Sequence, residues 1–584
     1  MQRRVGKGFA HISPPLPPSR MGSLSEKPAS RLNQKTLGVT NRIWLILVVF
    51  LGLVLFTRSI LPSDTSYYGR YRPVHIDAKP RNYLNVTEGS PVPFTFCPAL
   101  GPGDELADKY DPVALQKTRL HTGTGARIQR VITRALQGLP VTISVVGGSV
   151  SACHGTGDDP LSPSCYPSLF FNWWNSVFPH PASELTNGAM RRTSSAYFSF
   201  CNTHHVPEVT DLVIVELDVE DAGDRQSMDN FELLIRSLLI RPDQPAVLIL
   251  GHSSPQALEE SGFLGPDRWH TLVAQFYDVP HISAKPLLYP LYLHNPSQVQ
   301  QYFADPILAN SKGHELLSDV LISYFQSQTC SAWASAVGTA PELTPGPGPA
   351  VYREKAKTPT DARGLFGGVA QRKGAAGAAA PEDPEAADTG VNANPAHVAF
   401  AEPGSRQLSE QLYPNLKVPQ ARIGSRPADY LERSFEEISP FCVSANDLIN
   451  PLPPSMFSGS GWEVFHPAPG FAELNSHAHY WYSSLPTSKL RVGLQVGAGD
   501  IGIYYLKEPA SEVGLGSAIE CWVDDNYPGA VVIENSAQIS EAIPTLEIID
   551  HYVQRGSHYV ECQLLGEEDD RNVPPFKIIG IFST

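Results

Sequence analysis

The chain has 584 residues, of which 42% are hydrophobic and 18% charged, with 53 Pro and 46 Gly. That apolar fraction excludes a wholly disordered chain, and the length predicts several domains because single cores stop growing near about 250–300 residues. The net charge is −15; residues 1–42 carry eight basic side chains and one acidic one, which leaves −22 for the rest. A body this acidic excludes nucleic acid as a partner.

The first predicted element is an uncharged apolar run at 43–57, which reaches membrane-spanning length when continued to 61. A cleaved signal and a buried core helix are the alternatives, but a 42-residue basic leader is long for a signal. The positive flank makes 1–42 a cytoplasmic tail and 43–61 a signal anchor. The sequence thus predicts a single-pass type II membrane protein of the Golgi or secretory pathway, with the lipid bilayer as a partner.

Cysteine and glycosylation signals agree with a lumenal or extracellular body. All eight Cys lie beyond residue 96, as an oxidising compartment permits, and they allow too many pairings for any to be assigned. The sequon Asn85-Val86-Thr87 predicts glycosylation of Asn85 in a stem that covers 62–95.

Residues 96–335 alternate short apolar runs with amphipathic segments, which predicts an α/β domain with a parallel sheet covered on both faces. The expected strands are 141–146, 211–217 and 246–251. The expected helices are 166–178, 231–240, 269–277 and 314–326.

Residues 336–425 form a predicted Pro/Ala/Gly-rich linker of disordered type, since 28 of the 53 residues from Gly338 to Gly390 are Ala, Gly or Pro. From 426 to 584 the pattern predicts an antiparallel β-sandwich. Its expected strands are 490–496, 501–506, 518–523, 559–565 and 576–582. Five aromatic residues form either a sugar-stacking face or part of the sandwich core: Trp462, Tyr480, Trp481, Tyr482 and Trp522.

The stretch VTISVVGGSVSACHGTG at 141–157 is the most informative for chemistry. A buried strand that ends in Gly147-Gly148 permits a sharp turn and presents the Ser149 hydroxyl at the carboxyl edge of the sheet, where α/β folds bind ligands. The Ser149 N–H can then face a developing oxyanion. The alternative is a tight turn with incidental serines.

The later segments follow in a recognisable order. Thr186-Asn187-Gly188-Ala189 comes next, then a strand that ends Glu216-Leu217-Asp218-Val219-Glu220-Asp221, and finally Asp305-Pro306-Ile307-Leu308 before Gly313-His314. This succession resembles the SGNH (GDSL-like) hydrolase superfamily and implies its three-layer α/β fold. With FTFCPALGPG and ECWVDDNYPG near the two ends, the lumenal body also resembles fungal capsule-associated type II membrane proteins.

The resemblance assigns roles to particular residues. It implies that Ser149 is the nucleophile and that the N–H groups of Ser149 and Gly188 are oxyanion donors, with Gly148 and Asn187 in the same site. Glu220 stands where the superfamily has the oxyanion Asn.

The last block departs from the superfamily pattern as well. Asp305 matches the residue that orients the base, but Leu308 stands at the position of the catalytic His. His314 is the expected replacement base, with a structural role as its alternative, and His154 is a weaker candidate. A serine without a base is a poor nucleophile, so both departures reduce or remove catalysis.

Two functions follow. One is a serine esterase, or an O-acyltransferase, that acts on O-acetyl groups of cell-wall or capsular polysaccharide. The other is a catalytically degenerate relative that binds glycan or scaffolds Golgi glycosylation enzymes. The sequence contains no convincing nucleotide motif or set of metal ligands, so we expect neither cofactor nor metal.

Overall fold

The computed structural model describes residues 79–85, 91–157, 159–337, 372–373, 417–426, 435–446, 456–467, 476–567 and 573–584, together with short pieces between 35 and 51. The chain divides into two units, residues 1–75 and 76–584, each of which is treated by itself. In the first unit, β1 (Lys35–Thr36) pairs with β2 (Val39–Thr40) in an antiparallel manner.

The described residues contradict the predicted membrane protein. None of the helices in the described ranges combines the length and the apolar character needed to cross a bilayer. Residues 44, 48, 49 and 52–61 of the expected anchor lie outside the described residues. The single-pass type II topology is therefore wrong as a prediction, and with it the expected bilayer partner loses its support.

The predicted parallel sheet is present, in the order β3-β8-β7-β6-β4-β5-β9. Neighbouring strands from β8 to β5 run parallel, and the two edge strands β3 and β9 are antiparallel to their neighbours. The strands are β3 (Arg119–His121), β4 (Thr142–Gly147), β5 (Glu184–Asn187), β6 (Leu212–Glu216), β7 (Ala246–Gly251), β8 (His281–Ser283) and β9 (Arg372–Lys373). Chain order reverses at β4, which lies between β5 and β6, and such a switch point is where α/β sheets bind ligands.

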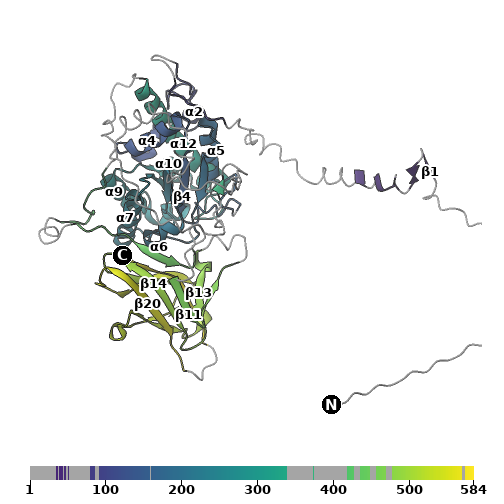
Figure 1. Cartoon of the computed structure of the whole chain (residues 1–584). Helices are drawn as coiled ribbons and strands as arrows, with labels where there is room; N and C mark the ends of the chain where they lie inside the picture. The colour runs from purple at the N-terminus through teal and green to yellow at the C-terminus, as the bar shows by residue number, and fades with distance from the viewer. Residues whose placement is uncertain are drawn as a thin grey trace, which may run out of the picture. The chain divides into compact units, whose positions relative to one another are not determined.

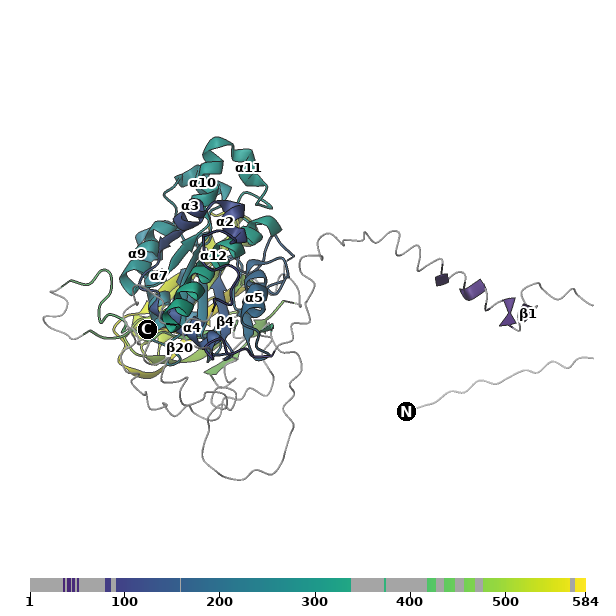
Figure 2. The ribbon, with the colours of Figure 1, turned by 90° about the horizontal axis from the view of Figure 1, so that it is seen from above.

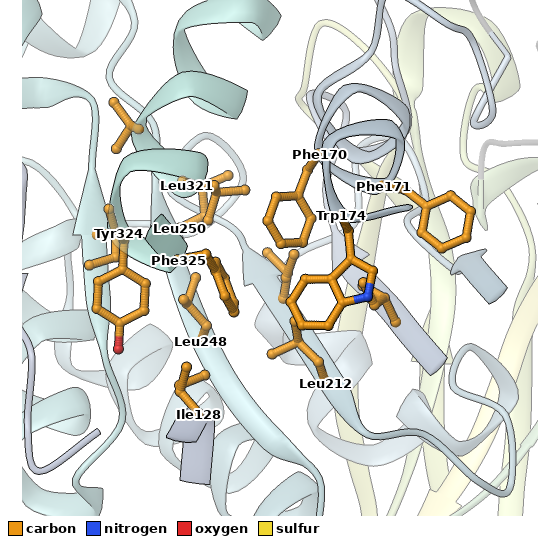
Figure 3. Close-up of a cluster of buried hydrophobic side chains, with 14 of the residues drawn as sticks. Ile128, Phe170, Phe171, Trp174, Leu212, Leu248, Leu250, Leu321, Tyr324 and Phe325 are labelled. Atoms are coloured by element: carbon orange, nitrogen blue, oxygen red, sulfur yellow. The ribbon is translucent and has the colours of Figure 1, made fainter. Parts of the chain in front are cut away.

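Helices cover both faces of this sheet, which confirms the three-layer prediction. On one face α4 (Ala126–Leu136), α5 (Tyr166–Val177) and α12 (Ser311–Ala336) pack on the strands in one hydrophobic cluster (Figure 1). Figure 3 shows the rings of Phe170 and Trp174 on α5 beside Phe325 on α12, and the ring centroids of Phe170 and Phe325 are 5.0 Å apart. The other face carries α6 (Ser195–Cys201), α7 (Arg225–Leu239) and α9 (Asp267–Tyr277).

Shorter helices complete this domain, and α10 and α11 lie beside each other in Figure 2. They are α2 (Glu105–Tyr110), α3 (Pro112–Lys117), α8 (Pro255–Ser261), α10 (Lys285–His294), α11 (Pro296–Gln300) and the 3-10 helix η2 (Asn202–His204).

The C-terminal part is a sandwich of two largely antiparallel sheets, as predicted. The first contains β12-β13-β21-β15-β18, with β10 paired to β21 and β19 paired to β15, and the second is β11-β14-β20-β16-β17. The strands are β10 (Phe441–Ser444), β11 (Phe457–Ser460), β12 (Glu463–Phe465), β13 (Tyr480–Ser483), β14 (Lys489–Val496), β15 (Ile501–Pro509), β16 (Ala518–Val523), β17 (Val531–Glu534), β18 (Ser536–Ala537), β19 (Ile543–Asp550), β20 (Gly556–Leu564) and β21 (Phe576–Ser583). Short helices η5 (Ser476–Ala478), α16 (Ala510–Val513) and η6 (Tyr527–Gly529) lie in its loops.

The sandwich and the α/β domain share a hydrophobic core. Tyr504, Leu506 and Phe582 belong to the same buried cluster as the residues of α6 and α7. The rings of Phe200 and Phe582 stack with centroids 3.9 Å apart. A contact this apolar is typical of domains that do not move independently.

Four disulfides join all eight Cys, a pattern that fits an oxidising extracellular or lumenal environment. The pair Cys201–Cys442 connects the end of α6 to β10 and so links the two domains covalently. The other pairs are Cys97–Cys330, Cys153–Cys165 and Cys521–Cys562.

Most of the predicted linker at 336–425 lies outside the described residues, but two pieces of it are described. Residues 372–373 form β9 at the sheet edge. Residues 417–425 lie against α7, where Arg236 donates to the carbonyl oxygens of Pro419 and Ala421 and Glu232 accepts the N–H of Ile423.

Candidate functional site

Ser149 follows β4 at the carboxyl edge of the sheet, as the sequence predicts, and β4 is the strand at which chain order reverses. The turn is held by Gly148, whose N–H donates to the carbonyl oxygen of Glu216 at the end of β6. A Cβ on Gly148 would lie 2.1 Å from Cγ of Glu220, so only glycine permits that side chain to approach. The glycine therefore brings the ends of β4 and β6 together, and with them Ser149 and Glu220.

The Ser149 hydroxyl has two partners among the described residues. Its Oγ donates to Oε1 of Glu220, and it accepts the backbone N–H of Arg192 at 3.0 Å. The same Oε1 accepts the Ser149 N–H at 2.9 Å. Burial raises the pKa of Glu220, although the hydrogen bonds from Ser149 oppose that rise. A carboxylate held this way is a stronger base than an exposed one.

Arg192 is a site residue that the sequence analysis missed. Its φ of 53° places it in the left-handed region, which a residue with a side chain seldom adopts. That conformation accompanies a backbone N–H directed at Ser149, and strain of this kind gathers at functional sites. Nothing in the local sequence announces it, since neither glycine nor asparagine stands at the position.

Gly188 is not the oxyanion donor that the resemblance implied. Its N–H donates to the carbonyl oxygen of Val145 on β4, at 2.9 Å. Its lack of a side chain matters for packing, since a Cβ would lie 2.0 Å from the backbone oxygen of His205. Asn187 is also structural, because its Nδ2 donates to the carbonyl oxygens of Ser151 and Pro160.

The predicted base is likewise not in place. His314 is fully buried at the start of α12, where its Nδ1 accepts the Tyr166 N–H at 3.3 Å, and burial lowers its pKa to about 3. Asp305 has no hydrogen bond to a histidine among the described residues; its Oδ1 accepts the N–H groups of Ile307 and Leu308 in its own turn. Leu308 is half-buried against the apolar core. His154 contributes a backbone N–H to the Ser149 carbonyl, as a turn residue.

A buried ionic cluster of His270, Asp218 and Asp221 stabilises the loop after β6 that carries Glu220. His270 on α9 lies between two carboxylates, with Nδ1 2.6 Å from Asp218 and Nε2 3.0 Å from Asp221. Burial would lower the pKa of His270, but the two carboxylates outweigh it and raise the pKa to about 10. Asp221 also accepts the Ser195 N–H, so the cluster fixes the loop after β6 against α6.

The β-sandwich reaches the same site through Arg192. His477 in η5 donates from Nε2 to the Arg192 carbonyl oxygen at 2.9 Å, and Glu541 pairs with the Arg192 guanidinium at 3.0 Å. Burial lowers the pKa of His477 to about 4, so the ring is neutral and its single N–H donates this hydrogen bond. Both domains therefore fix the position of Arg192, whose N–H donates to the Ser149 hydroxyl.

The remaining candidates divide clearly. Trp481 and Trp522 are each 3% exposed, so neither offers a ring face to a ligand. Tyr480 and Tyr482 are half-buried and lie on the side of β13 opposite to Trp481. Asn85 is exposed, and the rest of its sequon lies outside the described ranges. Within those ranges, acidic, His and Cys side chains form no group that could hold a metal ion.

Comparison with known proteins yields structural relatives but no sequence family. No protein-family model and no curated protein matches the chain. The crystal structure of a two-domain esterase active on acetylated mannans matches with a TM-score of 0.52 and 17% identity, over 80% of this chain and 98% of that one. The two-domain esterase active on acetylated mannans co-crystallised with mannopentaose gives a TM-score of 0.51 and 16% identity, over 80% and 97%. The α/β domain and the β-sandwich together thus have the fold of a two-domain esterase.

Proposed function

We propose that this protein acts on ester-linked acyl groups of polysaccharides through Ser149. Glu220 is the general base, in place of the histidine that has this role in the SGNH superfamily. The observation that carries the proposal is the hydrogen bond from Ser149 Oγ to the Glu220 carboxylate at the sheet's switch point. The substrate class is taken from the mannan esterase that shares the fold.

The chemistry needs one carboxyl group in two states. Ionised Glu220 takes the Ser149 proton while Oγ forms a bond to the acyl carbon, and the neutral acid that results no longer repels the oxyanion. In the structure the Ser149 and Arg192 N–H groups donate to Glu220 Oε1 and Ser149 Oγ; in the proposed step they turn to the developing charge. Glu220 returns its proton to the departing sugar oxygen as the ester C–O bond breaks. Ionised Glu220 then takes a proton from water or a second sugar hydroxyl as that oxygen bonds the acyl carbon. It gives the proton to Ser149 Oγ as the acyl–Oγ bond breaks, which completes hydrolysis or transfer.

The test uses the full chain with p-nitrophenyl acetate and acetylated manno-oligosaccharides. We expect Ser149→Ala and Glu220→Gln each to lower kcat/KM by at least about 100-fold, since a general base contributes that much. Because the pKa of Glu220 is raised and the base must be ionised, activity should increase with pH through a value above the usual carboxylate range. Equal rates in wild type and Ser149→Ala would refute the proposal.

A second function is favoured by one contact. The Ser149 N–H already donates to Glu220, so an ionised carboxylate fills the place where an oxyanion would form. In that case the protein binds acylated glycan without turning it over. The double substitution Leu308→His with Glu220→Asn separates the two: an inactive wild type together with Ser149-dependent activity in the double variant supports the binding function.

A further inference from the structure

The β-sandwich contacts the Ser149 site through His477, and the chain then runs from His477 into β13. His477 contacts the Arg192 carbonyl, and Arg192 donates to Ser149 Oγ. Three residues later the chain enters β13, which begins at Tyr480. At about 3.3 Å per residue, the path from His477 to Tyr482 extends at most roughly 16 Å. Whatever lies on β13 is therefore within reach of a chain molecule that is bound at Ser149.

One side of β13 and its partner β12 carries three aromatic rings. Tyr480 and Tyr482 alternate with buried Trp481, and Phe465 on β12 lies opposite Tyr480 in the register. The Phe465 and Tyr480 rings stack at 5.0 Å, and Tyr480 and Tyr482 lie 6.0 Å apart. Phe465 is 41% exposed, so part of its ring is open to solvent. We call Phe465, Tyr480 and Tyr482 the aromatic strip.

Polar groups border the aromatic strip on both sides. Glu463 accepts the Tyr482 hydroxyl proton at 2.9 Å, and Lys577 lies 5.5 Å from the centre of the Tyr480 ring. Lys577 is itself paired with Glu508 at 2.6 Å. Charges of both signs around exposed rings do not favour a polyanion. They suit a ligand that presents apolar C–H faces and many hydroxyl groups, as a neutral polysaccharide does.

We propose that the aromatic strip binds the polysaccharide whose acyl group reaches Ser149. The rings stack on sugar faces, Glu463 and Lys577 bond hydroxyl groups, and His477 joins the strip to the site through Arg192. This inference rests on the proposed function, because it assigns the strip to the same substrate. It explains why the edge strand β12 carries the exposed ring of Phe465, where proteins usually place charge.

The experiment measures polymer binding apart from turnover. Affinity electrophoresis in acetylated mannan is run in the Ser149→Ala background, with Phe465→Ala and Tyr482→Ala compared with Tyr552→Ala. Tyr552 is 95% exposed in the same domain, which makes it the matched control. We expect each strip variant to weaken binding by roughly three- to tenfold and Tyr552→Ala to leave it unchanged. With Ser149 intact, the ratio of kcat/KM on acetylated manno-oligosaccharide to that on p-nitrophenyl acetate should fall in the strip variants.

Unaltered binding in both strip variants would overturn the inference, as would a change of oligomeric state without loss of glycan binding, which would make β12 an edge for a second copy. If an alanine variant unfolds early, Phe465→Leu keeps the apolar volume without the ring and carries the same expectation. Failure of the proposed function looks different: Ser149→Ala would keep wild-type turnover while the strip variants still lose affinity.

Discussion

Replacing His270 should destabilise the protein strongly and in a pH-dependent way. The ring is 1% exposed and hydrogen-bonded to Asp218 and Asp221, so His270→Gln leaves two buried carboxylates without a cation. Removing one partner from a buried ionic cluster costs about 3–5 kcal/mol. The pKa of His270 rises from 6.5 to about 10, which at about 1.4 kcal/mol per pH unit sets a ceiling of about 5 kcal/mol.

The direction with pH follows from the raised pKa. Because the folded protein holds this proton more tightly than the unfolded chain, the stabilisation is complete below about pH 6.5 and is lost as pH rises towards 10. Urea denaturation of wild type and His270→Gln at pH 6 and pH 9.5 measures the difference. The difference in free energy of unfolding between wild type and His270→Gln should be large at pH 6 and smaller at pH 9.5. His551→Gln is the control, since its ion pair with Asp500 is exposed and should contribute little. A gap that is independent of pH would refute a charged His270.

Two further predictions concern packing and covalent linkage. Gly188→Ala should cost about 1–3 kcal/mol, because the new methyl group meets the His205 carbonyl oxygen at 2.0 Å; an unchanged urea midpoint would contradict that clash. Replacing both Cys201 and Cys442 with Ser should lower the free energy of unfolding by about 2–5 kcal/mol, because the bond joins residues 241 positions apart across the domain contact. Thermal unfolding of the oxidised wild type and the double variant checks this, and equal midpoints would count against it.

Strong apolar patterns predicted the central elements well. The expected strand 246–251 matches β7, and 518–523 matches β16, because continuous or alternating apolar runs leave few options for a buried strand. The short strands β5 and β8 were not predicted. Their sequences, ELTN and HIS, have little apolar character, and they form strands because β4 and β7 offer paired hydrogen bonds beside them.

The site was predicted only in part. Local sequence was enough for the turn that carries Ser149, because a buried strand ends there in two glycines; Glu220 entered the site only through the family resemblance. The sequence left His314 between a catalytic and a structural role, because a histidine near a helix start can turn towards the site or the core. Its contact with Tyr166 joins positions 148 residues apart. The apolar anchor at 43–61 was predicted from hydropathy and the basic residues before it, which carry no information on the tertiary structure.

Sequence by itself therefore determined the α/β and β domains, the glycine turn and the serine that follows it, because these depend on neighbouring residues and on periodicity. Only the tertiary structure decided that the Arg192 N–H points at Ser149 and that His477 of the β-sandwich holds Arg192 from a position 285 residues away. The physical reason is that a hydrogen bond between distant loops depends on how strand ends and packed domains bring them together. The local sequence around Arg192 or His477 therefore does not predict this contact.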